Sequence, residues 1–346
     1  MRKRVLFICG SLNQTTQMHQ IAAELPEYDL YFTPFYSDGV WDLARRLGLA
    51  EITVMGHKHS ARSVAYLEGH GLKIDFKGKR HRYDLAVTCS DLIVPANLKR
   101  GKVVLVQEGM TDPESLLYHI VRRAPMLPRW LASTAATGLS DKYDRFCVAS
   151  YGYRDLFIRR GVKPYKIVVT GIPNFDSCQK FLKNEFPHKD FVLVCTSDTR
   201  ETFKRDDRPR LLRKALSIAA GRQLIFKLHP NERVERSTRE ILRYAPNALV
   251  YSSGSAEEMI ANCTVLITQY SSTAFVGLAL GKEVHSLFEI GELRRLMPLQ
   301  NGGAARNIAN VCHNLIEGLT PENECSPTAP ARRGAPDGRV QSATVE

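Results

Sequence analysis

The chain has 346 residues, of which 44% are hydrophobic and 24% charged, a composition typical of a soluble globular protein. Its length suits two domains better than a single core. The formal net charge of +12 favours anionic partners, but no zinc-finger, homeodomain or RNP-type motif supports binding to nucleic acid. The eight cysteines form no Cys-x-x-Cys pair, so we expect buried, reduced thiols in the cytosol rather than a zinc site.

In the first half of the chain, short apolar runs alternate with helical stretches. A strand at residues 5–9 leads into a turn at residues 10–16, and a helix is predicted to begin near Gln17. This alternation predicts a parallel sheet with helices on both faces. Further strands are predicted at residues 28–32, 51–54, 85–88, 103–107, 145–149 and 167–170.

The same pattern restarts after a polar linker at residues 177–190. The chain is therefore expected to form two facing Rossmann-like domains, residues 1–176 and 191–320, whose ligands bind in a cleft at the carboxyl ends of the strands. Residues 321–346 are rich in Pro, Ala, Gly, Ser and Arg, which predicts a disordered tail. In the second domain we predict strands at residues 191–195, 223–227, 249–251 and 264–268, and helices at residues 208–220, 234–244 and 256–262.

Two short polar segments follow predicted strands of the second half. His229 and Pro230 end one strand, and the proline holds the preceding residue in an extended conformation, which aims the imidazole outward. Ser271, Ser272 and Thr273 follow the last predicted strand, where one of the serines would cap the next helix. If the segments meet across adjacent strands, they present an imidazole and three hydroxyls to one anion, such as a nucleotide phosphate. Taken alone, each segment is more simply a surface histidine or a helix cap.

The first half supplies the candidate residues for acid–base chemistry. Glu108 comes directly after a predicted strand, and Gly109 lets the backbone turn sharply under it. Asp91 also follows a predicted strand, with helix capping as its alternative role. Either carboxylate could serve as a general base that faces the cleft. Gly10 and Ser11, in the first turn, could shape an acceptor site, although this turn is not a GxGxxG motif.

The segment 114–139 allows two interpretations. It combines Leu, Ile, Val, Met and Trp with Arg122, Arg123 and Arg129. Such a stretch could lie on an anionic membrane surface, or it could pack on the sheet with its arginines in water, which is the simpler interpretation. In both cases we expect a cytoplasmic protein, because the apolar run at residues 5–9 is too short for a signal peptide and no run approaches the ~18 apolar residues of a spanning helix.

Residues 3–300 resemble the GT-B superfamily, which contains glycosyltransferases and UDP-N-acetylglucosamine 2-epimerases. His229-Pro230 and Ser271-Ser272-Thr273 are similar to the HP and S-S/T motifs of bacterial sialyl-, polysialyl- and Kdo-transferases and of CDP-glycerol glycerophosphotransferases. The resemblance implies that these residues hold the phosphate of a nucleotide-activated donor. It also implies that an acid near Glu258 can hold a ribose, although a first-turn acid favoured by the helix dipole is the simpler interpretation.

Other segments are similar to the epimerases of that superfamily. Residues 169–176 resemble VTGNxxxD, residues 107–109 resemble VEAG, and Ser90-Asp91 resembles GD. The histidine of the epimerase segment TxHRREN, however, would fall on Asp198, and Thr199 would replace an arginine. The epimerase segment DSGG would fall on residues 269–272, with both glycines lost. The resemblance therefore favours a transferase.

The resemblance implies a GT-B fold, with an interdomain cleft, and a glycosyltransferase that uses a nucleotide-activated sugar. The implied acceptor is a glycan or a lipid-linked glycan in capsule, surface-polysaccharide or glycolipid synthesis, with the protein in the cytoplasm or peripheral at the inner face of the membrane. We expect no cofactor and no metal, because no acid pair of the DxD kind stands at a suitable strand end. Two alternatives stay open: an epimerase-like nucleotide-sugar enzyme, and a non-catalytic nucleotide-binding protein of the same fold.

Overall fold

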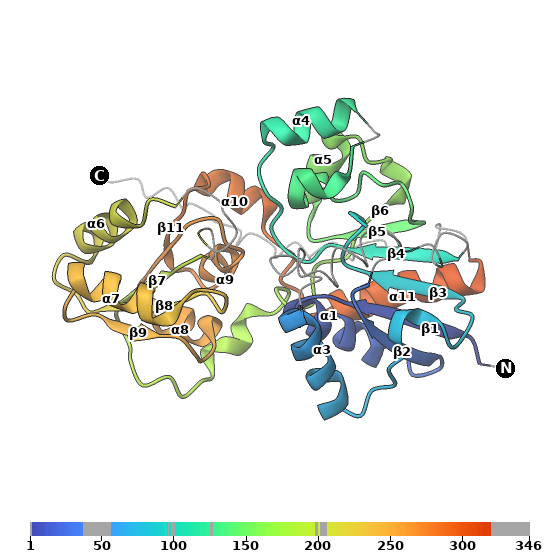
Figure 1. Cartoon of the computed structure of the whole chain (residues 1–346), viewed down its shortest axis with the longest axis horizontal. Helices are drawn as coiled ribbons and strands as arrows, with labels where there is room; N and C mark the ends of the chain where they lie inside the picture. The colour runs from blue at the N-terminus through green and yellow to red at the C-terminus, as the bar shows by residue number, and fades with distance from the viewer. Residues whose placement is uncertain are drawn as a thin grey trace, which may run out of the picture.

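The computed structural model describes residues 2–36, 57–93, 95, 97, 101–124, 127–197, 200 and 206–319. In this part of the chain two parallel β-sheets, each flanked by helices, form two α/β domains (Figure 1). The predicted strand at residues 51–54 and the tail at residues 321–346 lie outside the described residues, as do Asp198 and Thr199.

The first sheet has the strand order β2-β1-β3-β4-β5-β6, and all its pairings are parallel. Along β1, Leu6 and Ile8 belong to one hydrophobic cluster, whereas Val5 and Phe7 belong to another. Both faces of the sheet are therefore buried, which explains why its strands are continuous apolar runs. Its strands are β1 (Arg4–Cys9), β2 (Asp29–Pro34), β3 (Leu85–Thr88), β4 (Lys102–Val106), β5 (Arg145–Val148) and β6 (Ile167–Val169).

The second sheet is also parallel, in the order β11-β10-β7-β8-β9. Its first strand along the chain, β7, stands beside β10, and the chain builds outward in opposite directions from this pair. At such a switch point the loops after neighbouring strands diverge and leave a crevice at the carboxyl ends. Its strands are β7 (Val192–Cys195), β8 (Leu224–Lys227), β9 (Leu249–Tyr251), β10 (Val265–Thr268) and β11 (Glu283–His285).

Local capping decides where several helices begin. Helix α1 begins at Leu12, earlier than the predicted start near Gln17, because the side chain of Ser11 accepts a hydrogen bond from the Gln14 N–H and shortens the turn.

No described helix is long and apolar enough to cross a membrane. The helices are α1 (Leu12–Ala23), α3 (His57–Gly69), α4 (Leu116–Arg123), α5 (Tyr151–Arg160), α6 (Arg208–Ala219), α7 (Val234–Tyr244), α8 (Ala256–Asn262), α9 (Thr273–Ala279), α10 (Ile290–Leu296) and α11 (Ala304–Glu317), with 3₁₀ turns η1 (Phe76–Gly78), η3 (Arg129–Ala136), η4 (Pro164–Lys166) and η5 (Cys178–Leu182).

The last helix, α11, returns to the first domain and packs against α1, β3 and β4 (Figure 1). Its residues Ile308 and Cys312 join the same hydrophobic cluster as Val5. The return is fixed at Asp176, whose carboxylate accepts a hydrogen bond from the Ala304 N–H at 2.8 Å, and whose pKa is raised by burial. The range 191–320, expected to form the second domain, thus includes a helix that completes the core of the first.

Candidate functional site

A cavity of about 240 Å³ lies between the two domains at the carboxyl ends of the strands. The loop after β4 in the first domain forms one wall, and loops after four strands of the second domain form the other. This is the position at which folds with open parallel sheets bind ligands. The lining residues are Met110, Thr111 and Asp112 from the first domain, and Thr196, Ser197, His229, Tyr270, Ser271, Ser272 and Phe288 from the second.

His229 lines this cavity from the turn that follows β8. Its backbone N–H donates to Glu232 Oε2 at 3.0 Å and to Thr196 Oγ1 at 3.2 Å, so the turn is held from below. The Asn231 N–H donates to His229 Nδ1 at 3.3 Å. Because Nδ1 is an acceptor, the neutral ring carries its proton on Nε2, which can then donate a hydrogen bond. Pro230 is exposed and lies outside the cavity lining.

The serine pair after β10 also lines the cavity. Ser271 Oγ accepts hydrogen bonds from the N–H and the hydroxyl of Thr273, at 3.3 and 2.9 Å. Ser272 stands at the N-cap position of α9, but among the described residues its hydroxyl caps no backbone N–H. The expected capping role therefore belongs in part to Ser271, and the hydroxyl of Ser272 is not used for it.

The predicted meeting of these two segments across adjacent strands is wrong in one respect. Strand β7 lies between β8 and β10, so the segments carrying His229 and Ser271 stand two strands apart. The residues after β7, Thr196 and Ser197, occupy the middle of the cavity wall. The sequence did not predict that these two residues line the site, because strand order depends on contacts between distant segments.

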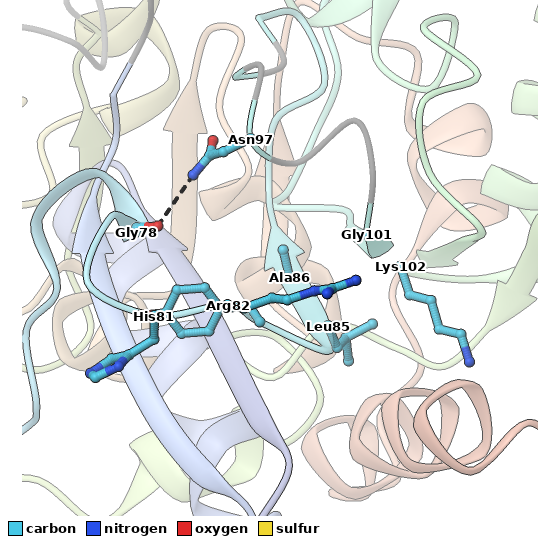
Figure 2. Close-up of a pocket in the computed structure, with 9 residues that line it drawn as sticks. Gly78, His81, Arg82, Leu85, Ala86, Asn97, Gly101 and Lys102 are labelled. Atoms are coloured by element: carbon cyan, nitrogen blue, oxygen red, sulfur yellow. Dashed lines mark hydrogen bonds between the residues drawn. The ribbon is translucent and has the colours of Figure 1, made fainter.

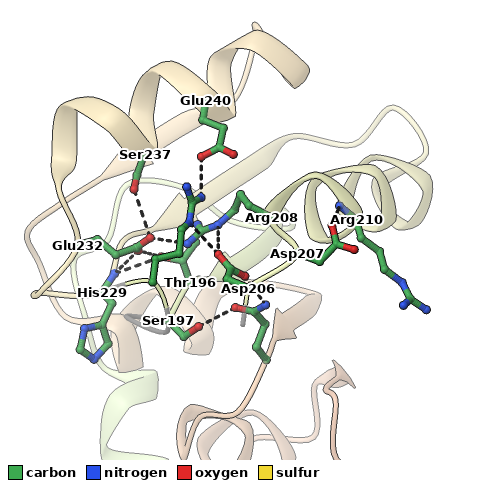
Figure 3. Close-up of polar contacts among 12 residues, drawn as sticks. Thr196, Ser197, Asp206, Asp207, Arg208, Arg210, His229, Glu232, Ser237 and Glu240 are labelled. Atoms are coloured by element: carbon green, nitrogen blue, oxygen red, sulfur yellow. Dashed lines mark hydrogen bonds and ion pairs between the residues drawn. The ribbon is translucent and has the colours of Figure 1, made fainter. Parts of the chain in front are cut away.

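A buried polar network supports this wall from behind (Figure 3). The carboxylate of Glu232 accepts hydrogen bonds from Arg208, Thr196 and Ser237, and its side chain is fully buried. Figure 3 shows the His229 imidazole pointing away from these contacts. The network fixes the turn at both ends, which preorganises the side chains that line the cavity. The sequence signal was the acid three residues after His229, a spacing that closes a turn.

Asp206 forms the second half of the network. Its carboxylate accepts hydrogen bonds from Arg200, Arg208 and Gln269, and the amide oxygen of Gln269 accepts one from Ser197 Oγ at 2.6 Å. Burial raises the pKa of Asp206, but the hydrogen bond from Gln269 and the charge of Arg208 outweigh it and hold the pKa below its ordinary value. Asp206 is therefore ionised at neutral pH and pairs with two buried or half-buried arginines.

Glu108 lies on the first-domain side, two residues after the end of β4. Ser11 Oγ donates to Glu108 Oε1 at 3.0 Å, and Gln14 Nε2 donates to Glu108 Oε2 at 2.5 Å. Gly10 makes room for this contact, because a Cβ at this position would stand 1.9 Å from Gln14 Oε1. The structure thus brings together Gly10, Ser11 and Glu108, which the sequence analysis had proposed separately.

The loop after Glu108 touches the second domain. A Cβ on Gly109 would stand 3.7 Å from the Cβ of Ser272, an ordinary van der Waals distance, so this loop lies against the serine pair. Glu108 is half-buried and lies next to the cavity rather than in its lining. The loop that carries Glu108 therefore reaches the serine pair from the first-domain side of the cleft.

The remaining wall is braced by Arg160, a residue that the sequence analysis did not single out. This buried side chain of α5 donates to Thr111 Oγ1 and to the carbonyl oxygen of Asp112, both at 3.2 Å. It also pairs with Glu114 at 3.2 Å. The loop that closes the first-domain side of the cavity is therefore held in place by a charged side chain beneath it.

Asp91 lies away from the cavity, in the interior of the first domain. Its two carboxylate oxygens accept hydrogen bonds from the N–H groups of Gly138 and Ser140, both at 3.0 Å, and it is 2% exposed. Burial raises its pKa above the ordinary value. These contacts make Asp91 an anchor for the loop at residues 138–140, away from the interdomain cavity.

Glu258 lies in the first turn of α8, where the Ser255 hydroxyl accepts a hydrogen bond from the Glu258 N–H at 3.2 Å. The side chain is half-buried and is not part of the cavity lining. This placement agrees with the simpler interpretation, in which an acid near a helix N-terminus is stabilised by the helix dipole.

A second, larger cavity of about 440 Å³ lies at the opposite edge of the first sheet. It is lined by the residues around the starts of β3 and β4, among them Arg82, Leu85 and Lys102 (Figure 2). Its position at the amino ends of the strands is not where this class of fold places its ligands. We therefore assign the candidate site to the smaller interdomain cavity.

No protein-family model matches the sequence, and no curated protein sequence matches it. Solved structures do resemble most of the chain. A UDP-N-acetylglucosamine 2-epimerase from Methanocaldococcus jannaschii, solved with UDP-GlcNAc and UDP, superposes with a TM-score of 0.54 at 14% identity, over 90% of this chain and 99% of that one. The wall teichoic acid polymerase TagF gives a TM-score of 0.52 at 13% identity, over 91% and 89% of the two chains. The protein has the GT-B fold.

Proposed function

We propose that this GT-B protein is a glycosyltransferase that uses a nucleotide-activated sugar. One observation carries the proposal: the imidazole of His229 and the hydroxyls of Ser271 and Ser272 line the same cavity, opposite a loop of the first domain. Donors placed in this way can stabilise the negative charge that develops on a leaving phosphate. Thr273 contributes by orienting the Ser271 hydroxyl, to which it donates a hydrogen bond.

In the proposed reaction an acceptor hydroxyl attacks the anomeric carbon of the donor. The bond from that carbon to the phosphate oxygen breaks, its electron pair goes to the phosphate, and the acceptor proton passes to Glu108. The hydrogen bonds from Ser11 and Gln14 orient the Glu108 carboxylate without placing a cation beside it. A half-buried carboxylate in such surroundings can act as a general base. We propose a glycan or lipid-linked acceptor, as in surface-polysaccharide or glycolipid synthesis.

Nucleotide binding tests the donor half of the proposal. CMP, CDP, UMP and UDP are compared by thermal shift, and at a concentration of 100 Kd the preferred nucleotide raises the free energy of unfolding by about 2.7 kcal/mol. We expect His229→Ala and Ser272→Ala each to weaken binding at least about tenfold, because each removes a phosphate donor. Ser253→Ala, on an exposed loop of the same domain, serves as the matched control. Unchanged affinity in both site variants would contradict the assignment.

Catalysis is tested separately with the nucleotide sugar that the binding screen selects. Glu108→Gln is expected to lower the transfer rate by about 10²–10⁴-fold, the usual contribution of a general base, while nucleotide affinity is unchanged. Incubation with UDP-N-acetylglucosamine and no acceptor separates transfer from epimerisation. Formation of the 2-epimer would overturn the proposal, as would a Glu108→Gln variant with full transfer activity.

A further inference from the structure

Helix α4 has an apolar side that no described part of the chain covers. Leu116, Leu117 and Ile120 are 76%, 51% and 43% exposed. Positions i, i+1 and i+4 share one side of an α-helix, so the three side chains form one continuous strip. The opposite side carries Tyr118 and Val121, which are buried against η3. The helix is therefore apolar on two sides, and its own domain accounts for one of them.

Cationic side chains stand at the end of the helix that carries this strip. Arg122 and Arg123 are exposed in the last turn of α4. Beyond the helix, Leu127 and Trp130 are each 38% exposed. The interpretation in which this segment simply packs on the sheet accounts for Tyr118 but not for the strip. Leucine and tryptophan beside arginines are the composition of a surface that rests in the interface of an anionic bilayer.

The position of α4 ties this strip to the candidate site. The helix is capped by Ser115 and begins five residues after Thr111, which lines the interdomain cavity. Arg160 bonds Thr111, Asp112 and Glu114, so the helix and the cavity wall are held by one side chain. Figure 1 shows α4 at the outer end of the first domain, beyond α5. A surface that the strip contacts therefore lies close to the cleft.

We propose that Leu116, Leu117 and Ile120 dock the protein on an anionic membrane surface. Charge favours this occupant over a second copy of the chain, because each copy carries a formal charge of +12 and two copies repel each other. An anionic bilayer attracts both the arginines and the chain as a whole. This inference rests on the proposed function and specifies its acceptor. If the protein docks through α4, the acceptor is carried by a lipid of that membrane.

Vesicle co-sedimentation, without any substrate, tests the docking. The full chain is mixed with vesicles of phosphatidylcholine containing phosphatidylglycerol and, in parallel, with phosphatidylcholine alone. We expect binding to the anionic vesicles that falls at high salt. The triple variant Leu116→Ser, Leu117→Ser, Ile120→Ser should bind at least about tenfold more weakly, because it removes the inserting side chains. The matched control is Leu216→Ser with Leu242→Ser, which are 38% and 37% exposed on helices of the second domain.

A second variant, Arg122→Glu with Arg123→Glu, should lose the preference for anionic vesicles, and circular dichroism checks that each variant is folded. The proposal is overturned if the wild-type chain does not bind vesicles, or if a folded triple variant binds as the wild type does. A concentration-dependent dimer that the triple substitution dissociates would also overturn it and assign the strip to a protein contact. The His229→Ala variant should bind vesicles normally, so a failed donor site and a failed docking surface give different results.

Discussion

The Glu108 carboxylate receives hydrogen bonds from the side chains of Ser11 and Gln14 at the wall of the cleft. The Asp91 carboxylate receives two from backbone N–H groups, those of Gly138 and Ser140, in the protein interior. Both acids follow a strand of the same sheet, yet their partners differ. A carboxylate that saturates buried backbone donors stabilises the fold, whereas one held by side chains at a cleft can exchange a proton with a ligand.

At the residue scale we predict that two isosteric substitutions change the free energy of unfolding by different amounts. Asp91→Asn places an amide N–H₂ against a buried backbone N–H, and should lower the free energy of unfolding by about 1–3 kcal/mol. Glu108→Gln should change it by less than about 0.5 kcal/mol, because the neighbouring side chains can reorient. Urea denaturation measures both. If Asp91→Asn is as stable as the wild type but inactive, Asp91 has the catalytic role instead.

At the element scale, the two domains meet where the N-terminus of α5 faces the C-terminus of α10. Ser150, the N-cap of α5, donates its hydroxyl hydrogen to the Leu296 carbonyl at 3.1 Å. A Cβ on Gly152 would stand 2.0 Å from the carbonyl oxygen of Arg295. The two helix ends carry opposite partial charges, so their contact is favourable as well as close. Glycine is required at this position by the neighbouring backbone rather than by its own conformation.

We therefore predict that Gly152→Ala destabilises the protein by about 1–3 kcal/mol, the usual cost of overpacking, because a backbone carbonyl must move. The control is Gly69→Ala at the end of α3, where an added Cβ meets no atom within 4 Å. This control should be neutral within about 0.5 kcal/mol. Urea denaturation of both variants measures the difference, and equal stability of the two would show that the α5–α10 contact adapts easily.

At the scale of the whole molecule, the described part of the chain crosses between the two domains twice. The first crossing follows β6, and the second leads from α10 to α11. The two crossings are bonded together: Gln300 donates to the Phe175 carbonyl and accepts from the Cys178 N–H, and the Gly302 N–H donates to the Asp176 carbonyl. Helix α11 then fills one face of the first sheet, so the first domain is completed by the end of the described chain.

The assignment of α11 predicts where a core substitution acts. Ile308→Ala, at a fully buried position, should cost about 2–5 kcal/mol. Hydrogen-exchange mass spectrometry should show faster exchange in β1 and α1 than in β10. Leu266→Ala, equally buried in β10, should show the reverse. Faster exchange throughout the second domain in Ile308→Ala would instead place α11 energetically with that domain.

Much of the fold could be predicted from the sequence because the signals are local. Apolar runs of three to six residues mark most of the strands from β1 to β10 that the structure describes. β11 was missed, since only one of its three residues, Val284, is apolar. The placement of His229, Ser271 and Ser272 at strand ends was also readable, because parallel strands bring their carboxyl ends to one edge.

The sequence by itself determined the alternation of strands and helices, the two parallel sheets and the edge at which polar residues gather. The tertiary structure decided which strands are neighbours, and so placed Thr196 and Ser197 between His229 and the serine pair. It also decided that Glu108 meets Ser11 from a segment 97 residues away, while Asp91 is turned inward. The physical reason is range: periodicity and capping act over a few residues, whereas these contacts join distant segments that only the packed chain brings together.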